Sequence, residues 1–316
     1  MSRIVKIATI CTGGPVQVKE NRKNLDEIIS HIDSVAEEAL YDRPDIILFP
    51  EYSDIVYSEC PENVFAFCKY RGNAIHEHIA GICKKNKVNI CYGSFRDGKD
   101  GWYRNSAVFV GRNGETAGIY NKNHLVMEEF TDYRIKYGED PVLTETDFGK
   151  VGAAICYDLQ FDELREKYMK LGPELIVFPT SFPGGFLKQH WAFSNRCWFV
   201  SSYGSPRASS EVINPLGEVV AKSSYYFRHM TTEINLDYCI AHLDYNGERI
   251  KKMKAKYGEK VEVQAPGGLG RALITSYADD VSAVDMAKEF EIELIDDLFS
   301  RNLESRRNAV NSCLGL

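Results

Sequence analysis

Up to Leu236, short runs of consecutive apolar residues alternate with longer segments in which apolar residues recur every three or four positions. The first pattern is typical of strands buried on both faces, and the second of helices that pack one face on a sheet. Strands that alternate with helices indicate a layered α/β fold. The predicted strands cover residues 5–10, 46–49, 88–95, 151–155, 173–180, 198–202 and 232–236, and the predicted helices cover residues 24–40, 64–83 and 187–196.

Two predicted hairpins interrupt this alternation. Residues 106–110 and 115–120 flank the tetrapeptide Gly-Arg-Asn-Gly, and Asn-Gly is typical of a tight turn. Residues 211–214 and 218–222 flank a Pro-Leu-Gly turn in the same way. Hairpin strands are antiparallel, whereas strands joined through a helix are parallel, so we predict mixed sheets.

The last eighty or so residues are predicted to be mainly helical. Residues 238–257 are rich in charge and have a helical spacing, and residues 283–303 form an amphipathic helical pattern. The residues predicted to face inward on the second helix are Val284, Ala287, Phe290, Leu294, Leu298 and Phe299.

We expect a single domain over residues 1–316, with a core of about residues 1–237 and a C-terminal extension of about residues 238–316. No low-complexity linker separates the two parts. The apolar stripe of the extension predicts that it packs over the core and contributes to a homodimer or a larger homo-oligomer.

The composition argues against several classes of partner. The chain is 44% hydrophobic and 26% charged, which is ordinary for a globular protein. Its net charge of −7 lacks the basic footprint expected of proteins that bind nucleic acid or anionic membranes, and no apolar run is long enough to span a bilayer. Nine scattered cysteines without a Cys-x-x-Cys pair indicate reduced thiols. We therefore expect a cytoplasmic protein without nucleic-acid or membrane partners.

No metal or cofactor is expected from the sequence. The seven histidines are scattered, and His76 and His78 are two positions apart on a predicted helix, so their side chains face different directions. The glycine-rich residues 265–270 do not match Gly-x-Gly-x-x-Gly and do not join a strand to a helix. We interpret them as a structural turn.

Cys156 lies where a buried strand gives way to a turn and then a helix. The apolar run of residues 151–155 ends at Cys156, and Phe161, Leu164 and Tyr168 follow at helical spacing. A helix that begins just beyond a cysteine favours the thiolate, because the N-terminal end of a helix is partly positive. Cys156 is therefore a candidate nucleophile, although many free cysteines are simply small buried apolar residues.

Glu51 follows a similar strand. The segment PDIILFPE, residues 44–51, has an echo 129 residues later in PELIVFPT, residues 173–180. This echo is either a chance recurrence or a sign of two similar halves that each end a central strand at the same rim. A carboxylate at the end of a buried strand is either solvated or functional.

Lys122 comes directly after the first predicted hairpin, so Glu51, Lys122 and Cys156 each follow a strand. Hydrolysis of an amide bond uses these three residue types together. A cysteine attacks the carbonyl, a carboxylate moves the proton, and a cation stabilises the oxyanion. The three residues in this order predict a cysteine-dependent hydrolase.

Other interpretations use the same residues differently. Glu51 is then a charge at the rim, Lys122 an exposed lysine and His124 a core histidine, in an inactive domain that serves for binding or assembly. A rival enzyme would pair Cys156 with His124 or His190 as the base, but no further motif supports either histidine.

These motifs resemble those of the nitrilase superfamily, the carbon–nitrogen hydrolases, from about Val5 to about Leu236. The resemblance rests on Pro50-Glu51 after its strand, on the Lys-Asn-His-Leu of residues 122–125, and on Cys156-Tyr157-Asp158, with weaker similarity at residues 178–179 and 214–217. It implies a four-layer α-β-β-α sandwich with two mixed sheets, followed here by a C-terminal helical tail. It also implies a triad of Glu51, Lys122 and Cys156.

The resemblance implies one further site residue. A second glutamate near the lysine often assists in the family, and Glu129 lies at the matching distance, with Glu128 as the alternate. We expect the backbone N–H of Tyr157 to join Lys122 in holding the oxyanion. One departure concerns residues 191–195, where many members carry Arg-Ala-x-Glu-Asn and this chain has Trp-Ala-Phe-Ser-Asn.

The implied function is the hydrolysis of a small amide or N-carbamoyl compound through a thioester on Cys156, with release of ammonia. The segment Cys156-Tyr157-Asp158 is closer to the amidase and N-carbamoyl branches than to the Cys-Trp-Glu of true nitrilases, and nitrile hydrolysis is the alternative. We expect the walls of the substrate pocket to come from residues 52–62, 130–137 and 182–186.

Overall fold

The chain is described by a computed structural model that covers residues 3–205 and 207–314, with side chains up to residue 311. It forms two compact units, Val5–Ile234 and a second unit made of Asn235 onward together with the residues up to Ile4. That the whole chain behaves as one domain stays a prediction. Each unit has its own hydrophobic core.

The first sheet of the larger unit has six strands, in the order β14-β1-β3-β5-β6-β7. Its three successive strands β1, β3 and β5 are parallel, and β5, β6 and β7 form antiparallel hairpins, so the sheet is mixed as predicted. The strands are β1 (Ile4–Ile10), β3 (Ile46–Leu48), β5 (Asn89–Asp97), β6 (Tyr103–Val110), β7 (Thr116–Asn121) and β14 (His229–Asn235).

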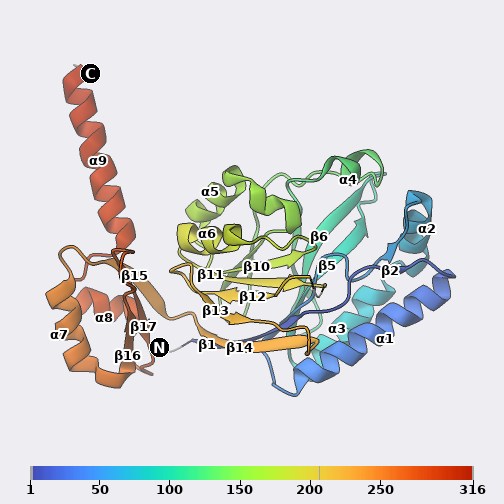
Figure 1. The fold of residues 1–316 in the computed structure, drawn as a ribbon, viewed down its shortest axis with the longest axis horizontal. Helices are drawn as coiled ribbons and strands as arrows, with labels where there is room; N and C mark the ends of the chain where they lie inside the picture. Colours follow the sequence, from blue (N-terminus) through green and yellow to red (C-terminus); the bar gives the residue numbers. More distant parts are fainter. Residues whose placement is uncertain (1–2, 206, 315–316) are drawn as a thin grey trace. The chain divides into compact units, whose positions relative to one another are not determined.

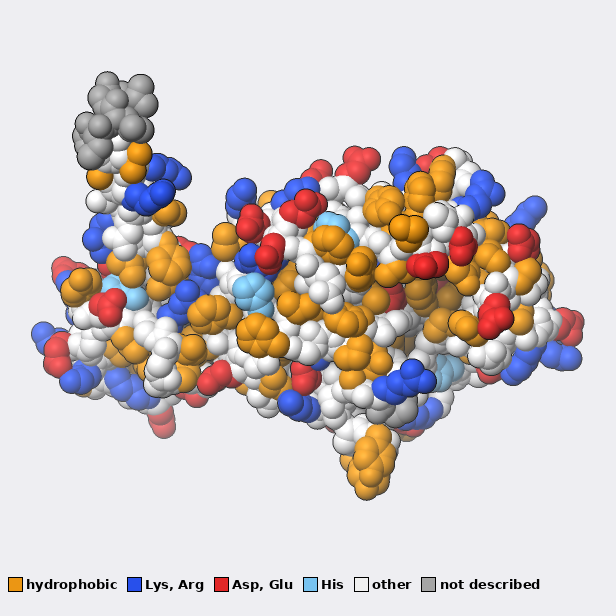
Figure 2. Space-filling model, turned by 45° about the horizontal axis from the view of Figure 1, so that its top comes forward, with side chains coloured by type: hydrophobic (Ala, Val, Ile, Leu, Met, Phe, Trp, Pro, Cys, Tyr) orange, Lys and Arg blue, Asp and Glu red, His pale blue; other side chains and the backbone are white. Residues whose placement is uncertain are grey.

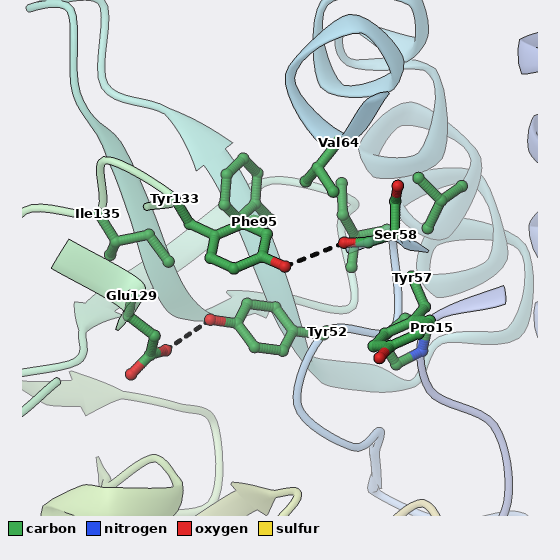
Figure 3. A pocket seen from close by; sticks show the side chains of 11 residues that line it. Pro15, Tyr52, Tyr57, Ser58, Val64, Phe95, Glu129, Tyr133 and Ile135 are labelled. Atoms are coloured by element: carbon green, nitrogen blue, oxygen red, sulfur yellow. Dashed lines mark hydrogen bonds between the residues drawn. The ribbon is translucent and has the colours of Figure 1, made fainter. Parts of the chain in front are cut away.

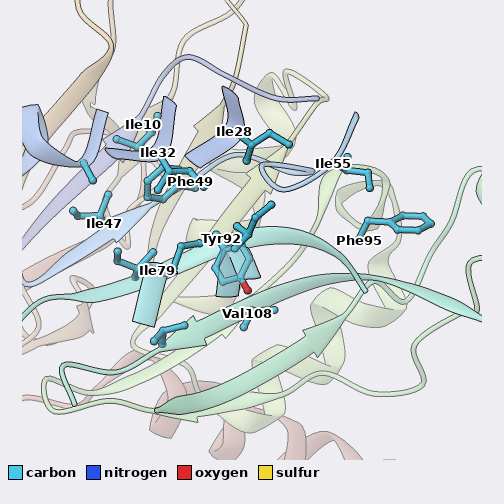
Figure 4. Packing of buried hydrophobic residues seen from close by; sticks show 14 of the residues in the cluster. Ile10, Ile28, Ile32, Ile47, Phe49, Ile55, Ile79, Tyr92, Phe95 and Val108 are labelled. Carbon is cyan, nitrogen blue, oxygen red and sulfur yellow. The ribbon is translucent and has the colours of Figure 1, made fainter. Parts of the chain in front are cut away.

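Helices α1 (Asn21–Leu40), α2 (Pro61–Arg71) and α3 (Ala74–Asn86) accompany this sheet. Apolar side chains from α1 and α3 pack against those of the strands in a continuous buried cluster (Figure 4). The buried residues that carry this contact include Ile28, Ile32, Ile47, Ile79, Tyr92 and Val108.

The single helix predicted over residues 64–83 is wrong, because α2 and α3 are separate. The chain turns at Gly72, which has a φ of 49°. This left-handed conformation ends α2 and is one that glycine adopts without a steric penalty.

The second sheet also has six strands, in the order β13-β12-β11-β10-β9-β8. Its central strands β9, β10 and β11 are parallel, and hairpins extend it on both sides. Its elements are β8 (Leu143–Glu145), β9 (Lys150–Ala153), β10 (Leu175–Thr180), β11 (Trp198–Tyr203), β12 (Glu211–Ile213) and β13 (Val219–Lys222), with helices α5 (Asp162–Leu171) and α6 (Phe186–Asn195). Tyr168 of α5 and Trp191 of α6 are fully buried.

The two sheets pack face to face. The Thr9 hydroxyl donates to the Ser201 carbonyl at 2.8 Å, and the Ser202 hydroxyl donates to the Ile10 carbonyl at 2.7 Å. Figure 1 shows α1 and α3 on one side of the paired sheets and α5 and α6 on the other. The predicted four-layer α-β-β-α sandwich is therefore confirmed. A small ladder of β2 (Val16–Gln17) and β4 (Val56–Tyr57) completes this unit.

The C-terminal unit is less helical than predicted. It contains a three-stranded antiparallel sheet in the order β15-β17-β16, with its own buried cluster. Its elements are β15 (Tyr238–His242), α7 (Gly247–Tyr257), η2 (Gly258–Lys260), β16 (Val261–Gln264), β17 (Arg271–Ser276), α8 (Ala283–Glu289) and α9 (Ile295–Leu314). The glycine-rich segment of residues 265–270 is the turn between β16 and β17, as predicted.

Two helix predictions in this unit are wrong. Residues 238–242 form a strand, β15, because they pair along β17. The helix predicted over residues 283–303 is broken after Glu289, and Glu291 has a left-handed φ of 52° that stops α8. Val284, which was predicted to face inward, is 48% exposed, and Phe299 is also exposed.

Glycine at position 93, in the middle of β5, is required by the close approach of the segment that follows β3. A Cβ atom there would lie 2.4 Å from the Cα of Glu51 and 2.6 Å from the carbonyl oxygen of Pro50. Both are backbone atoms, so they cannot move aside as a flexible side chain would. We expect Gly93→Ala to lower the free energy of unfolding by about 1–3 kcal/mol, measured by urea denaturation.

Gly81, within α3, is the matched control for this substitution. A Cβ atom at Gly81 would meet nothing within 4 Å. Gly81→Ala should raise the free energy of unfolding by up to about 1 kcal/mol, because alanine is the better helix former. A Gly93→Ala protein as stable as the wild type would contradict the tight-approach account.

Candidate active site

Three residues that follow strands come together where the two sheets meet. Glu51 follows β3, Lys122 follows β7 and Cys156 follows β9. The Lys122 Nζ lies 3.2 Å from Glu51 Oε1, and the Cys156 thiol hydrogen-bonds to the Glu51 side chain. The structure therefore assembles the three residues that the sequence analysis selected.

The Glu51 carboxylate is buried and held by several donors. Its side chain is only 1% exposed, so the interpretation of Glu51 as a charge at the rim is wrong. Oε1 accepts from the Asn105 amide at 2.8 Å as well as from Lys122, and Oε2 accepts from the Ser181 backbone N–H at 2.9 Å.

The contact with Ser181 also explains the sequence echo. Ser181 follows β10, the strand whose sequence repeats that of β3. Both strands are interior and parallel to their neighbours in their own sheets. The hydrogen bond from Ser181 to Glu51 shows that the two strands end at the same rim, as the second interpretation of the echo predicted.

Lys122 is buried between two carboxylates, with a side chain 2% exposed. Its Nζ donates to Glu51 and to both oxygens of Glu129, at 3.0 and 2.8 Å. Burial alone would lower the pKa of Lys122, but the charges of Glu51 and Glu129 outweigh burial and raise it. Lys122 is therefore a permanently charged ammonium, and the exposed-lysine interpretation is wrong.

Glu129 lies on the short helix α4 (Met127–Thr131), and its side chain accepts from several donors. The Tyr52 hydroxyl donates to Oε1 at 2.5 Å, and the Asn105 amide donates to the same oxygen at 2.9 Å. Burial would raise the pKa of Glu129, but Lys122 and these hydrogen bonds lower it, so the carboxylate is ionised. Its neighbour Glu128 is exposed, so of the two candidates only Glu129 belongs to the cluster.

Cys156 begins a five-residue 3-10 turn, η1 (Cys156–Gln160), that separates β9 from α5. Its φ of 49° is left-handed, a strained conformation for a residue with a Cβ atom. Burial and the Glu51 carboxylate raise the pKa of the Cys156 thiol, and the opposing effect of Lys122 is smaller. The shift thus runs against the predicted stabilisation of a resting thiolate, and the thiol is protonated at rest and hydrogen-bonds to the Glu51 carboxylate.

Asp158 ties the segment that holds Cys156 to the segment that holds Lys122. Its fully buried carboxylate accepts from the backbone N–H of Ile155 at 2.9 Å, of Asn123 at 3.1 Å and of His124 at 2.8 Å. The Tyr120 hydroxyl donates to it at 2.7 Å. These bonds fix the distance between the two sheets at the position of the site.

The histidines proposed as rival bases lie in other contacts. His124 faces Asp158 and Glu163, each at 3.2 Å, and its ring stacks on Phe161. Burial would lower the pKa of His124, but the two carboxylates raise it, so the ring is more readily protonated and less of it is present as the neutral base. His190 lies on α6, where its Nδ1 is 3.4 Å from the Ser194 hydroxyl.

Tyr157 projects a half-exposed ring whose edge meets Phe161. Its backbone N–H, the predicted oxyanion donor, directly follows Cys156 in the chain.

Two residues of the cluster were not predicted. Asn105 lies on β6 and donates to both Glu51 and Glu129, and Tyr52 donates to Glu129. A polar asparagine next to the apolar run of residues 107–110 was the available signal for Asn105. Tyr52, directly after Glu51, was expected only as part of a pocket wall.

A cavity of about 220 Å³ borders this cluster. Tyr52 and Glu129 lie in its wall, with their hydrogen bond along one side, and the Tyr133 hydroxyl donates to the Ser58 carbonyl on the other (Figure 3). The remaining wall is largely apolar, and none of the described residues that line it is a Lys, Arg or His. Two of the three segments predicted as pocket walls, residues 52–62 and 130–137, contribute to it.

On the face shown in Figure 2, acidic and basic side chains intermingle. Within residues 3–205 and 207–314, no cluster of three or more His, Cys, Asp or Glu side chains is arranged to hold a metal ion, and no helix is long and apolar enough to cross a membrane.

The family of the chain follows from the fold, the site and the extent of the sequence match. The model of the carbon-nitrogen hydrolase family matches residues 8–242, more than half of the chain. The chain therefore belongs to the carbon-nitrogen hydrolase family, within the nitrilase superfamily, and the predicted resemblance is confirmed.

The named proteins that the chain resembles share only about a quarter of its residues over the matched region. The chain is 25% identical over 241 residues to the nitrilase and fragile histidine triad fusion protein NitFhit of Drosophila melanogaster. This match covers 69% of this chain and 51% of that protein. It is 28% identical over 246 residues to the chloroplastic omega-amidase of Arabidopsis thaliana, covering 69% of this chain and 63% of that enzyme. The match thus spans only half to two thirds of the length of these relatives.

A solved structure shares the fold. An amidase from Nesterenkonia sp. superposes with a TM-score of 0.61 at 19% sequence identity, covering 81% of this chain and 97% of the amidase. At this identity the likeness concerns the fold alone.

The protonation of Cys156 can be checked directly. Thiolate absorbs in the ultraviolet, so the difference in absorbance between the wild type and Cys156→Ala reports the ionisation of Cys156. Because the pKa of this thiol is raised, we expect no increase in that difference as the pH is raised to 9.0, the ordinary thiol pKa. Cys60→Ala, which removes an exposed thiol, is the matched control for the loss of one cysteine. A Cys156 thiolate already present at neutral pH would show that burial and Glu51 do not control the thiol.

Proposed function

We propose that the chain hydrolyses the carbon–nitrogen bond of a small amide or N-carbamoyl compound through a thioester on Cys156. The observation that carries this proposal is the buried contact of Lys122 with Glu51 and Glu129, beside a thiol that hydrogen-bonds to Glu51. A charged lysine and a basic carboxylate next to one sulfur are the groups that acyl transfer needs.

In the first half of the reaction, Glu51 takes the proton of the Cys156 thiol as sulfur attacks the carbonyl carbon. The negative charge that develops on the carbonyl oxygen is stabilised by Lys122 and by the backbone N–H of Tyr157. Glu51, now protonated, gives its proton to the leaving nitrogen. Ammonia or an amine departs, and the acyl group stays on sulfur as a thioester.

In the second half, Glu51 acts as a base again. It takes a proton from a water molecule, whose oxygen attacks the thioester carbonyl, and the same oxyanion donors stabilise the new intermediate. When this intermediate collapses, the carbon–sulfur bond breaks and the proton on Glu51 returns to Cys156. The free acid leaves and the starting state is restored.

Glu129 is proposed to act through Lys122. Its two oxygens lie 3.0 and 2.8 Å from Nζ, closer than Glu51 Oε1 at 3.2 Å. Glu129 therefore holds the ammonium charged and oriented while Glu51 is protonated during the reaction. Tyr52 and Asn105 fix Glu129 in turn.

An amide or N-carbamoyl substrate is favoured over a nitrile by the Cys156-Tyr157-Asp158 segment and by the names of the relatives, which include an omega-amidase and a deaminated glutathione amidase. A variant of the Nesterenkonia amidase carries the acetamide moiety of fluoroacetamide added covalently at its active-site cysteine. We further propose a cytoplasmic homodimer or larger homo-oligomer that acts on a small molecule without a cofactor.

Cys156→Ala should abolish turnover and leave the fold intact, because it removes the nucleophile and adds no bulk. The measurement is ammonia release over a panel of amides, N-carbamoyl amines and nitriles, with circular dichroism as the check of folding. Near-normal activity of the variant on any confirmed substrate would overturn the mechanism. Faster conversion of simple nitriles to acids than release of ammonia from every amide and N-carbamoyl compound would overturn the choice of substrate class.

Glu129→Gln should lower kcat by a factor of about 100 or more, since Lys122 then loses one of the charges that hold it. Glu128→Gln is the matched control, because Glu128 is the exposed neighbour on the same short helix. Its kcat should stay at the wild-type value. Equal kcat values for the two variants would show that Glu129 has no special role.

A further inference from the structure

A second, larger cavity of about 510 Å³ lies on the helix-facing side of the first sheet. The end of α2, the start of α3 and the strands β5, β6 and β7 contribute to its wall. The charged residues that line it, among those the structure describes, are Lys69, Arg71, Arg96 and Lys99, with Asp97 as the one carboxylate.

This lining has an excess of positive charge. Arg71 is neutralised by the buried carboxylate of Asp54, at 2.9 Å. Among the residues that the structure describes, Lys69, Arg96 and Lys99 form no ion pair. Three cations thus face the carboxylate of Asp97, which leaves an excess of two positive charges in a chain whose net charge is −7.

Arg96 is held in place by neutral groups. Its Nε donates to the Ser106 hydroxyl and its Nη2 donates to the Asn121 side chain, both at 3.1 Å. The guanidinium is partly buried, so it has lost part of its hydration without gaining a carboxylate partner. The Nε of Arg71 is also buried in the same wall and lacks an acceptor among the described residues.

We propose that this basic cavity binds the phosphate group of a small molecule, either free phosphate or a phosphate monoester. Phosphate carries between one and two negative charges near neutral pH, which matches the excess on the wall. Guanidinium and ammonium groups donate charge-assisted hydrogen bonds to its oxygens. Val108 and Ile119, which also line the cavity, offer contact to a less polar remainder of a monoester.

The cavity is separate from the candidate active site although the same strands serve both. On β6, Asn105 donates to Glu51 and Glu129, whereas the next residue, Ser106, contacts Arg96. At the end of β7, Asn121 contacts Arg96, and the next residue, Lys122, contacts Glu51. Successive residues of a strand point to opposite faces, so the two sites lie on opposite sides of the sheet.

Isothermal titration of the full chain with inorganic phosphate, glycerol phosphate and succinate at low ionic strength tests the proposal. We expect saturable binding of one phosphate or monoester per chain with a Kd of about 1 mM or tighter, and weaker binding of succinate. Lys69→Gln combined with Lys99→Gln should weaken binding by about tenfold or more, and so should Arg96→Gln. Comparison of the two phosphates distinguishes a free anion from a monoester.

Lys85→Gln is the matched control, since Lys85 is an exposed lysine of α3 outside the cavity wall. Its binding should equal that of the wild type. Because Lys69 and Lys99 are exposed, their variants should fold normally, as circular dichroism can confirm. Absence of saturable phosphate binding, equal binding of succinate, or an equal loss in Lys85→Gln would overturn the proposal. None of these outcomes bears on the hydrolase proposal, since the titration requires no turnover.

Discussion

The burial of the Lys122 ammonium between Glu51 and Glu129 is the interaction on which the site depends. A charge removed from water is costly unless it is paired, and here one cation meets two carboxylates. The arrangement carries a net negative charge, so further donors are needed, and Asn105, Tyr52 and the Ser181 N–H provide them. Each of these donors hydrogen-bonds to one of the two carboxylates, so a movement of any element that supplies a donor would break one of these hydrogen bonds.

The proposed catalytic residues are divided between the two sheets. Glu51 and Lys122 extend from strands of the first sheet and Cys156 from a strand of the second. The packing of the sandwich therefore assembles the site. Two interactions hold it at this point, the bond from Ser181 to Glu51 and the set of bonds that Asp158 accepts from the Lys122 segment.

Much of this architecture could be predicted from sequence because strand ends have clear chemical signals. An apolar run followed directly by Glu51 or Cys156 predicts both a strand and a candidate site residue at its end. The sequence could not show which direction the side chain of Asn105 faces within β6, because that depends on how β6 pairs with β5 and β7. It could not show Asp158 as the link between segments, since the bonds that make this link come from the backbone N–H groups of Asn123 and His124, more than thirty residues away.

The wrong predictions also concern features that are set by the three-dimensional structure. The helix expected over residues 64–83 is interrupted at Gly72, where the apolar periodicity happens to continue across the break. Residues 238–242 form a strand through their pairing with β17, which is distant in the sequence. The direction of the Cys156 pKa shift depends on burial and on Glu51, which outweigh the lowering effect of Lys122.

The central claim is that both halves of the reaction share one thioester on Cys156. It is tested most directly by partitioning two substrates that have the same acyl group and different leaving amines, in the presence of hydroxylamine. A common thioester predicts the same ratio of hydroxamate to free acid from both substrates, because the amine has already departed when water and hydroxylamine compete. A ratio that changes with the leaving amine would contradict the claim.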